Sequence, residues 1–466
     1  MRLKLLALSI CFSVSGIVAG PIEDLKPREW YEVPNSKMRS VDPCPKRPCA
    51  WSGIIGQTGV IDAWCGGAFD TKRDRLIVWG GGHADYAGNE LYTFDLNTLT
   101  WTRETNPGTP RIDSAYTLEG TPSSRHTYNF LQYLPSIDRF TSFSVGSLWG
   151  SGFAVPCSCV DAFDFDTKKW ERLASSNALG FMSAYDALTG NAWTGRSQFG
   201  MYEARLNKWS KMTEYDNIVA WSYYATTEID PKRRLMLAVG VSNGQTYKWD
   251  ISNLNIKITA SKMQTTGDTG IQSAKSPGLA YDPVTEQMVA WNGGSSVYTL
   301  NPDTKIWIKH TATNNVVPTA ATSAGTYGRF RYSPKKNVFV VVSGVDQNVF
   351  IYRHTASESA PQWYLDLLEP ETKAETRKDV KHIASLNVYP NPVYNKALIV
   401  LKGAAAGMAR LNVVDANGRK ISHMNVQTGS GSFFLDWSTT SLANGVYIIT
   451  AETGYGKISQ RFYISR

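Results

Sequence analysis

One phrase recurs along residues 61–354 and limits the fold more than any other feature of the sequence. It consists of a strand of small and aromatic residues ending in Asp, a turn, an apolar strand ending in Gly, a loop, an aromatic strand, a turn and a Trp. The clearest copy runs from Gly67 to Trp101, and a second runs from Leu279 to Trp307. Short segments separated by turns at this spacing predict antiparallel strands and exclude a helical solenoid. Four strands per repeat predict a β-propeller.

Six copies of the repeat can be counted. The weaker copies end at Trp170 and Trp209, or occupy residues 225–258 and 328–354. The segment Trp30–Val33 has no repeat of its own, so we expect it to close the last blade as a fourth strand. A degenerate seventh blade within residues 36–60 stays open. The expected fold class is all-β, with a six- or seven-bladed β-propeller in residues 21–354 and a small C-terminal β-sandwich.

The end of the chain has a different pattern. Residues 355–386 form a charge-rich linker, and residues 387–466 read as a separate β-sandwich. Its motifs are Leu386–Pro392, Leu411–Gly418 and Leu442–Thr450. This pattern closely resembles the C-terminal sorting domain of the type IX secretion system. The resemblance implies export across the outer membrane, followed by release or attachment to the cell surface, with the secretion machinery as a partner. An ordinary adhesive β-sandwich is the alternative.

The N-terminus reads as a signal peptide of residues 1–20. Arg2 and Lys4 precede the apolar run Leu5–Ile17, and Val18-Ala19-Gly20 offers small residues for cleavage. The apolar run is short for a bilayer span, and no other stretch approaches that length. We therefore expect an exported protein with no membrane span.

Composition favours a folded protein that does not bind nucleic acid. Hydrophobic residues make up 42% and charged residues 19%, which is enough apolar surface for a large core. The formal net charge is +8, but residues 387–466 alone contain eight Lys and Arg against three Asp and Glu. Because much of the basicity lies in the tail, without a basic cluster or a binding motif, a nucleic-acid partner is not expected.

The mature chain keeps five cysteines, an odd number. They are Cys44, Cys49, Cys65, Cys157 and Cys159. An exported chain can form disulfides, and the spacing of the first two indicates a small clipped loop, although the pairing stays open. The other three are weak candidates for a structural zinc site with a histidine, because zinc motifs usually show clearer paired spacing.

Candidate site residues follow from the phase of the repeat. In a propeller, the loops between strands 2 and 3, and the segments leading into each innermost strand, crowd one face around the central channel. His83 follows the triple glycine and opens such a loop, while His126 begins the innermost strand of the next blade. We expect both imidazoles on the same face. The alternative for each is a structural tie between a loop and backbone groups.

Other polar and aromatic residues fall at comparable positions. Arg196 and Tyr223 join the two histidines as catalytic candidates, and the substrate-binding candidates are Arg125, Tyr128, Tyr224, Lys275 and Arg329. Each of these alone is more often structural, since a tyrosine is commonly a core aromatic with one hydrogen bond. Together they would surround a channel mouth with imidazoles, phenols and cations.

Such a set suits β-elimination from a uronic acid. A cation neutralises the sugar carboxylate, which acidifies the adjacent C5 proton and stabilises the developing negative charge. A tyrosine or histidine removes that proton, and an acid protonates the leaving oxygen. This scheme requires no cofactor.

The repeats resemble kelch repeats, and the exported architecture together with the channel-face residues is similar to that of ulvan lyases. The resemblance implies a polysaccharide lyase acting on an acidic, uronate-containing algal polysaccharide. We expect the protein to be a monomer. It carries over His126 as a catalytic residue and Arg196 as the group that neutralises the carboxylate. A second histidine and a tyrosine would fall near Ser147 and Gly180, so His83 and Tyr223 take those roles.

Two other classes of function stay open. A kelch propeller can be a carbohydrate-binding or adhesive module that uses exposed Trp and Tyr as sugar platforms. A copper radical oxidase of the galactose oxidase kind also uses His and Tyr on such a propeller, and it needs a cysteine cross-linked to a tyrosine beside the metal. Binding of a polysaccharide without formation of any product would favour the carbohydrate-binding module. A copper assay, together with a search for the Cys–Tyr cross-link in tryptic peptides, would identify the oxidase.

Overall fold

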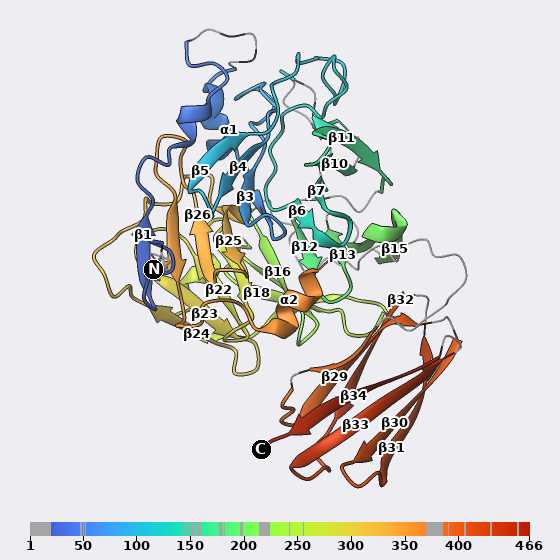
Figure 1. Cartoon of the computed structure of the whole chain (residues 1–466). Helices are drawn as coiled ribbons and strands as arrows, with labels where there is room; N and C mark the ends of the chain where they lie inside the picture. Colours follow the sequence, from blue (N-terminus) through green and yellow to red (C-terminus); the bar gives the residue numbers. More distant parts are fainter. Residues whose placement is uncertain are drawn as a thin grey trace, which may run out of the picture. The chain divides into compact units, whose positions relative to one another are not determined.

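The computed structural model describes most of the chain from Gly20 to Arg466 (Figure 1). Outside the described residues lie 1–19, 47–48, 50, 52, 144–145, 148, 151–153, 156–159, 177–179, 181, 196–198, 214–223, 242, 255, 370–384, 390, 405–406, 429–430 and 454–455. The predicted signal peptide lies outside them, apart from Gly20. Two compact units result: the first comprises the described residues up to Tyr185 together with Ala192–Ala360, and the second comprises Pro361–Arg466 together with the short stretch Asp186–Asn191.

The first unit is a β-propeller with six four-stranded antiparallel blades among the described residues, which confirms the predicted fold class. Blade 1 contains β2 (Gly67–Asp70), β3 (Arg75–Val78), β4 (Tyr92–Asp95) and β5 (Thr100–Arg103). Blade 2 contains β6 (Leu131–Leu134), β7 (Arg139–Ser142), β10 (Val160–Asp164) and β11 (Lys169–Leu173). Blade 3 contains β12 (Met182–Asp186), β13 (Asn191–Gly195), β14 (Phe199–Glu203) and β15 (Lys208–Thr213).

The remaining blades follow the same plan (Figure 1). Blade 4 contains β16 (Thr226–Asp230), β17 (Leu235–Val239), β18 (Thr246–Asp250) and β19 (Ala260–Met263). Blade 5 contains β21 (Gly278–Asp282), β22 (Gln287–Trp291), β23 (Val297–Asn301) and β24 (Ile306–His310), with β20 (Thr266–Gly267) added in parallel. Blade 6 contains β25 (Phe330–Ser333), β26 (Val338–Val341), β27 (Phe350–Arg353) and β1 (Glu29–Glu32).

Short helices and one hairpin connect these strands. The helices are η1 (Met38–Val41), η2 (Gly56–Thr58), α1 (Gly59–Asp62), η3 (Pro135–Ile137), η4 (Ala204–Leu206), η5 (Thr269–Ser273) and η6 (Tyr327–Arg329). The hairpin pairs β8 (Gly146–Ser147) with β9 (Ala154–Val155). The stretch 36–60, in which the sequence allows a seventh blade, contains helices and no strand in its described part.

The ring closes through the N-terminal strand, as the sequence predicts. Strand β1 pairs with β27, with Trp30 opposite Tyr352. The Trp30 side chain is buried and its Nε1 donates to the Ser295 carbonyl at 3.0 Å. The innermost strand β2 packs against both β6 and β25, so the first and last blades meet. Strand β1 therefore covers the edge that β27 would otherwise expose, and the blades keep only short outer edges.

Buried aspartates explain the recurring Asp at the end of the innermost strands. Asp70, Asp186, Asp230 and Asp282 are each buried. Each accepts a backbone N–H of the following turn, as when Asp230 binds the amides of Lys232 and Arg233 at 2.9 Å. An Asp side chain that satisfies turn amides stabilises the reversal between strands 1 and 2.

Charged and polar side chains cross the centre of the ring. The Arg331 guanidinium of β25 donates to the carbonyls of Gly67 on β2 and Leu131 on β6, and lies 3.5 Å from a carboxylate oxygen of Glu228 on β16. The Asn129 amide donates to Thr227 on β16 and to the Ser183 carbonyl on β12. These bonds tie five innermost strands together and satisfy polar groups that burial would otherwise leave costly.

A histidine pair lies beside the closing strand and predicts a pH-dependent stability. His354 stacks edge-on against His310 with ring centroids 5.0 Å apart, and contacts the Tyr352 hydroxyl at 3.3 Å. Burial, His310 and Arg28 lower the pKa of His354 to about 4, and burial lowers that of His310 as well, although Asp268 opposes this. The neutral imidazole is therefore the form that the folded state favours. Its stabilisation is complete above the unfolded pKa near 6.5 and is lost as the pH falls toward 4.

Urea unfolding of the wild type and His354→Gln between pH 7.5 and 4.5 tests this expectation. The free energy of unfolding of the wild type should fall by about 2 kcal/mol more than that of the variant over this range. The reason is that His354 takes up a proton in the unfolded chain but resists protonation in the folded protein. Equal losses in the two proteins would contradict it.

The second unit contains two antiparallel sheets and the helix α2 (Gln362–Leu368). One sheet is formed by β28 (Ser385–Tyr389), β29 (Lys396–Ala404) and β32 (Gly431–Ser438). The other is formed by β31 (Lys420–Thr428), β30 (Gly407–Asp415), β33 (Gly445–Thr453) and β34 (Gly456–Ile464). Leu401, Leu411, Ile449 and Phe462 from both sheets share one buried cluster, which is the packing of a β-sandwich. The helix α2 lies within the predicted linker.

Because this sandwich has its own core, we expect it to fold without the propeller and to carry no catalysis. Truncation after residue 370 should leave the melting of the propeller and any catalytic activity nearly unchanged. Calorimetry and activity of the truncated chain test this, and loss of either would show that the propeller depends on its tail.

Candidate functional site

The geometry of the blades places two sets of connections on one face of the propeller. Strands alternate in direction, so the loop between strands 2 and 3 and the segment leading into strand 1 both lie opposite the turns that carry the buried aspartates. His83 lies in the 2–3 loop of blade 1, after Gly80-Gly81-Gly82. His126 lies in the segment leading into β6 of blade 2.

The two imidazoles are in contact, which confirms that they share a face. Their rings stack with centroids 4.6 Å apart and planes inclined by 24°. Burial and the neighbouring His83 both lower the pKa of His126, while Asp85 opposes them. Two imidazolium ions at this separation would repel each other, so the pair favours a neutral His126 that can accept a proton. His83 Nδ1 is buried and has no hydrogen-bond partner among the described residues.

His126 lies between a carboxylate and a phenol. Its Nε2 is 3.3 Å from Oδ2 of Asp85, and its Nδ1 is 3.2 Å from the hydroxyl of Tyr128. An ionised carboxylate only accepts hydrogen bonds, so Asp85 selects the tautomer with the proton on Nε2. The Nδ1 lone pair then accepts from the Tyr128 hydroxyl. The resulting chain can move a proton from the phenol to the imidazole.

The absence of a side chain at Gly82 allows the Asp85 carboxylate to lie close to the His126 imidazole. Its φ of 81° lies in the left-handed region, and a Cβ there would be 2.2 Å from the Asp85 carboxylate and 3.0 Å from His126 Nε2. A side chain at this position would therefore displace the contact between Asp85 and His126.

Aromatic side chains extend the site along equivalent positions of other blades. Trp64 precedes β2, and its ring contacts that of His126 in a tilted arrangement with centroids 5.0 Å apart. Tyr327 precedes β25 and meets Tyr128 edge-on at 6.0 Å. Trp64, Tyr128 and Tyr327 all have positive φ, of 51°, 38° and 49°. Bulky residues in this region store strain, and strained residues cluster at functional sites.

Tyr224 and Lys275 add a cation to this face. They precede β16 and β21, and the Lys275 ammonium lies 4.8 Å from the centre of the Tyr224 ring. The Lys275 side chain is exposed. A lysine held over an aromatic ring remains available to an anionic group of a ligand.

The prediction that Arg125 and Arg329 bind substrate is not supported, because the structure places both side chains in the interior. Arg125 is 1% exposed, pairs with Asp161 at 3.2 Å and lies over the Trp79 ring. Arg329 is fully buried and donates to the carbonyls of Cys65, Val342 and Gly325. Their side chains therefore stabilise the blades and do not reach the face that carries the histidines. Two catalytic candidates, Arg196 and Tyr223, lie outside the described residues.

The cysteines divide into a disulfide and a buried thiol. Cys44 and Cys49 form a disulfide, as their spacing indicates. Cys65 is free and buried, its Sγ accepts the Gly81 amide at 3.1 Å, and burial raises its pKa to about 11. The thiol form disfavours a role as a metal ligand. Cys157 and Cys159 lie outside the described residues, and within the described part no three His, Cys, Asp or Glu side chains are grouped to hold a metal ion.

Sequence reasoning missed Asp85, Trp64 and Tyr327. Asp85 lies two residues after His83 in the same loop. Trp64 and Tyr327 occupy the phase of the repeat that singled out Tyr128 and Tyr224, so the same criterion, applied to every blade, would have found both.

The fold and these residues define a six-bladed propeller with a cluster of titratable groups on its loop face. Residues 387–465 match the family described as the secretion system C-terminal sorting domain. The chain therefore carries a type IX sorting domain: it is exported by that machinery and is secreted or attached to the cell surface. No helix in the described part of the chain is long and apolar enough to span a membrane.

Solved structures similar to this chain include two with low sequence identity. An auxiliary nutrient binding protein from Bacteroides ovatus is 12% identical, with a TM-score of 0.40, covering 69% of this chain and 76% of that one. The β-propeller domain of Cps50 (Swd1) from Myceliophteria thermophila is 11% identical, with a TM-score of 0.35, covering 62% and 96%. No curated protein matches the chain.

Proposed function

We propose that the protein is an exported polysaccharide lyase that cleaves a uronate-containing polysaccharide, ulvan being the first candidate, by β-elimination. The observation that carries the proposal is the stacked pair of His83 and His126, with Tyr128 and Asp85 bonded to the second imidazole. Such a cluster provides both a proton acceptor and a proton donor within one site.

The reaction needs three contributions from the site. As the C5 proton moves to the base, the electron pair of that bond forms the C4–C5 double bond and the C4–O bond breaks. Tyr128, deprotonated by His126, accepts the C5 proton, and the single proton then held by the stacked pair, on His126 or His83, goes to the leaving oxygen. The proposal keeps Arg196 as the group that neutralises the carboxylate and Tyr223 as the alternative base. Lys275 is a second cation for the carboxylate.

Incubation of the purified protein with a panel of uronate polysaccharides tests the proposal. The expected result is growing absorbance from unsaturated uronate ends, together with shorter chains. If no member of the panel yields unsaturated product, the protein is not a lyase of this class.

A carbohydrate-binding module is the second candidate, and the aromatic groups Trp64, Tyr128 and Tyr224 on the same face favour it. Aromatic rings provide apolar platforms of large area at low entropic cost. Binding of a polysaccharide without any change in its length would support this function. Copper uptake and a Cys–Tyr cross-link in tryptic peptides would instead identify a radical oxidase.

A further inference from the structure

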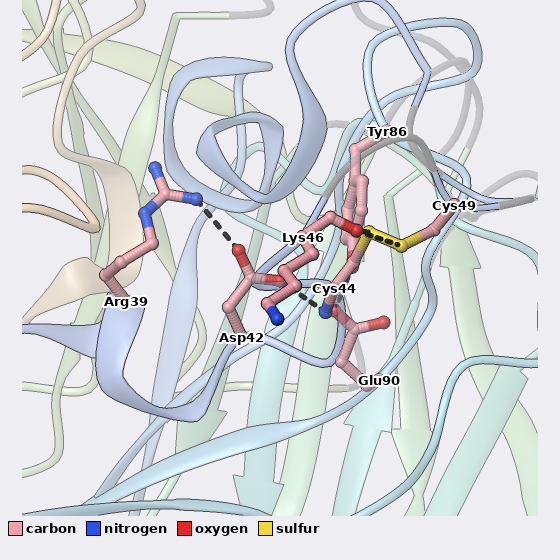
Figure 2. The surroundings of a disulfide bond; sticks show 7 residues. All are labelled: Arg39, Asp42, Cys44, Lys46, Cys49, Tyr86 and Glu90. Atoms are coloured by element: carbon pink, nitrogen blue, oxygen red, sulfur yellow. Dashed lines mark hydrogen bonds and ion pairs between the residues drawn. A yellow bond between two sulfur atoms is a disulfide. The ribbon is translucent and has the colours of Figure 1, made fainter.

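The chain between Arg39 and Thr58, here called the brace segment, precedes the first blade and contains the disulfide. Figure 2 shows Cys44 and Cys49 with Tyr86 and Glu90 beside them. Cys44 is 3% exposed, and its amide donates to Oδ1 of Asp42 at 2.8 Å. The disulfide thus closes a small loop whose first cysteine lies in the protein interior.

Arg39 fixes both ends of the brace segment. Its guanidinium donates to both carboxylate oxygens of Asp346, in the 2–3 loop of blade 6, at 2.9 and 2.8 Å. It also reaches Asp42 at 3.1 Å, Gln57 at 3.2 Å and Thr58 at 3.1 Å. One planar group therefore joins the start and the end of the segment to the body of the propeller.

The brace segment pairs directly with the loop that carries His83 and Asp85. The Ile55 amide donates to the Asp85 carbonyl at 2.9 Å, and the Ile54 amide donates to that of Ala84 at 3.2 Å. In the other direction, the Ala87 amide donates to the Trp51 carbonyl at 3.0 Å. Three backbone bonds around one residue hold the backbone of Asp85 in place.

The buried carboxyl group of Glu90 also contacts the loop that contains His83 and Asp85. Glu90 is fully buried and accepts the hydroxyls of Tyr86 and Tyr92 on one oxygen, while its other oxygen has no partner among the described residues. The Gln57 amide of the brace segment donates to the Tyr92 hydroxyl at 3.0 Å. Tyr86 is the neighbour of Asp85, so the brace segment reaches the loop through side chains as well as backbone.

We propose that the brace segment, closed by Cys44 and Cys49, positions Asp85 against His126, so that this disulfide controls the geometry of the candidate site from outside the repeat. Asp85 and the cysteines are positioning residues, because they act through His126. The consequence for catalysis rests on the proposed function, whereas the positioning itself does not.

The pKa of His126, followed by nuclear magnetic resonance, tests the positioning without any substrate. The groups that face His126 are His83, Asp85 and Tyr128, and of these Asp85 is the one that raises its pKa. Asp85→Asn should therefore lower the His126 pKa further. The double variant Cys44→Ser/Cys49→Ser should also lower the His126 pKa. Tyr86→Phe, which removes only a hydroxyl, should have a smaller effect of the same sign.

Thr299→Val is the matched control, because it removes a hydrogen bond to His310 in blade 5 and leaves the brace segment intact. It should not change the His126 pKa. If the double cysteine variant melts at a lower temperature but keeps the wild-type His126 pKa, the disulfide only stabilises the fold and the proposal is wrong. An unchanged His126 pKa in Tyr86→Phe as well would show that neither the disulfide nor the Tyr86 hydroxyl positions Asp85.

The pH profile of polysaccharide cleavage provides the second readout. In the double cysteine variant, the acidic limb of the kcat profile should shift to lower pH together with the measured pKa of His126. A protein that shows the pKa shift but no cleavage would overturn the proposed function and leave the positioning role intact.

Discussion

Replacing His126 by asparagine is expected to lower kcat for cleavage of a uronate polysaccharide by about 10²–10⁴-fold, without a change in melting temperature. The reason is that asparagine cannot accept the Tyr128 proton at the position of Nδ1, 3.2 Å from the hydroxyl. Release of unsaturated product, followed at saturating substrate with a melting curve of the same preparation, measures both quantities.

His310→Asn is the matched control for this variant. His310 is a second half-buried imidazole, in contact with the ring of His354 in blade 6, and it is not part of the candidate site. It should keep the wild-type kcat. Tyr128→Phe, Tyr223→Phe and Arg196→Asn then decide which phenol acts as the base and whether Arg196 neutralises the carboxylate. If His126→Asn and Arg196→Asn both release product at the wild-type rate, the assigned site is wrong even for a true lyase.

Replacing Arg331 by methionine is expected to lower the free energy of unfolding of the propeller by about 3–5 kcal/mol. The substitution leaves the Gly67 and Leu131 carbonyls without their donor and Glu228 without its cation. Urea unfolding of the propeller measures the difference, and Arg111→Ala, which removes an exposed ion pair with Asp113 in the same unit, is the control. The control should leave the free energy of unfolding nearly unchanged.

The pH dependence of this variant gives a second check. Burial raises the pKa of Glu228 to about 6, and Arg331 opposes that shift. Without the arginine the Glu228 pKa should rise further, so the variant should be more destabilised at pH 8, where the carboxyl must ionise, than at pH 5. Adding Glu228→Gln should recover part of the loss. A single variant within about 0.5 kcal/mol of the wild type would contradict the role of Arg331 in joining the blades.

Much of the architecture could be predicted from local patterns. The same sequence pattern of strands, turns and a Trp recurs in each blade, because each blade must bury the same faces. Counting the copies of this pattern gives six blades. The unpaired segment around Trp30 indicates how the ring closes, and the phase of the repeat brings His83 and His126 to one face. The tail is recognisable because its motifs belong to one compact module.

The partners of individual side chains depend on which blades the closed ring brings together. Arg125 and Arg329 fall at repeat positions that the sequence predicts to lie on the loop face. Their guanidinium groups instead point into the interior, where Arg125 pairs with Asp161 and Arg329 donates to backbone carbonyls. Arg331 crosses the ring to strands distant in sequence, and the disulfide lies outside every repeat yet contacts the loop of Asp85. The sequence by itself determined the propeller fold, the order of its blades and the loop face, because those follow from strand periodicity, but it left six and seven blades open. Only the tertiary structure decided which carboxylate meets His126 and which arginines are buried, because rotamers and burial are set by contacts between chain segments far apart in sequence.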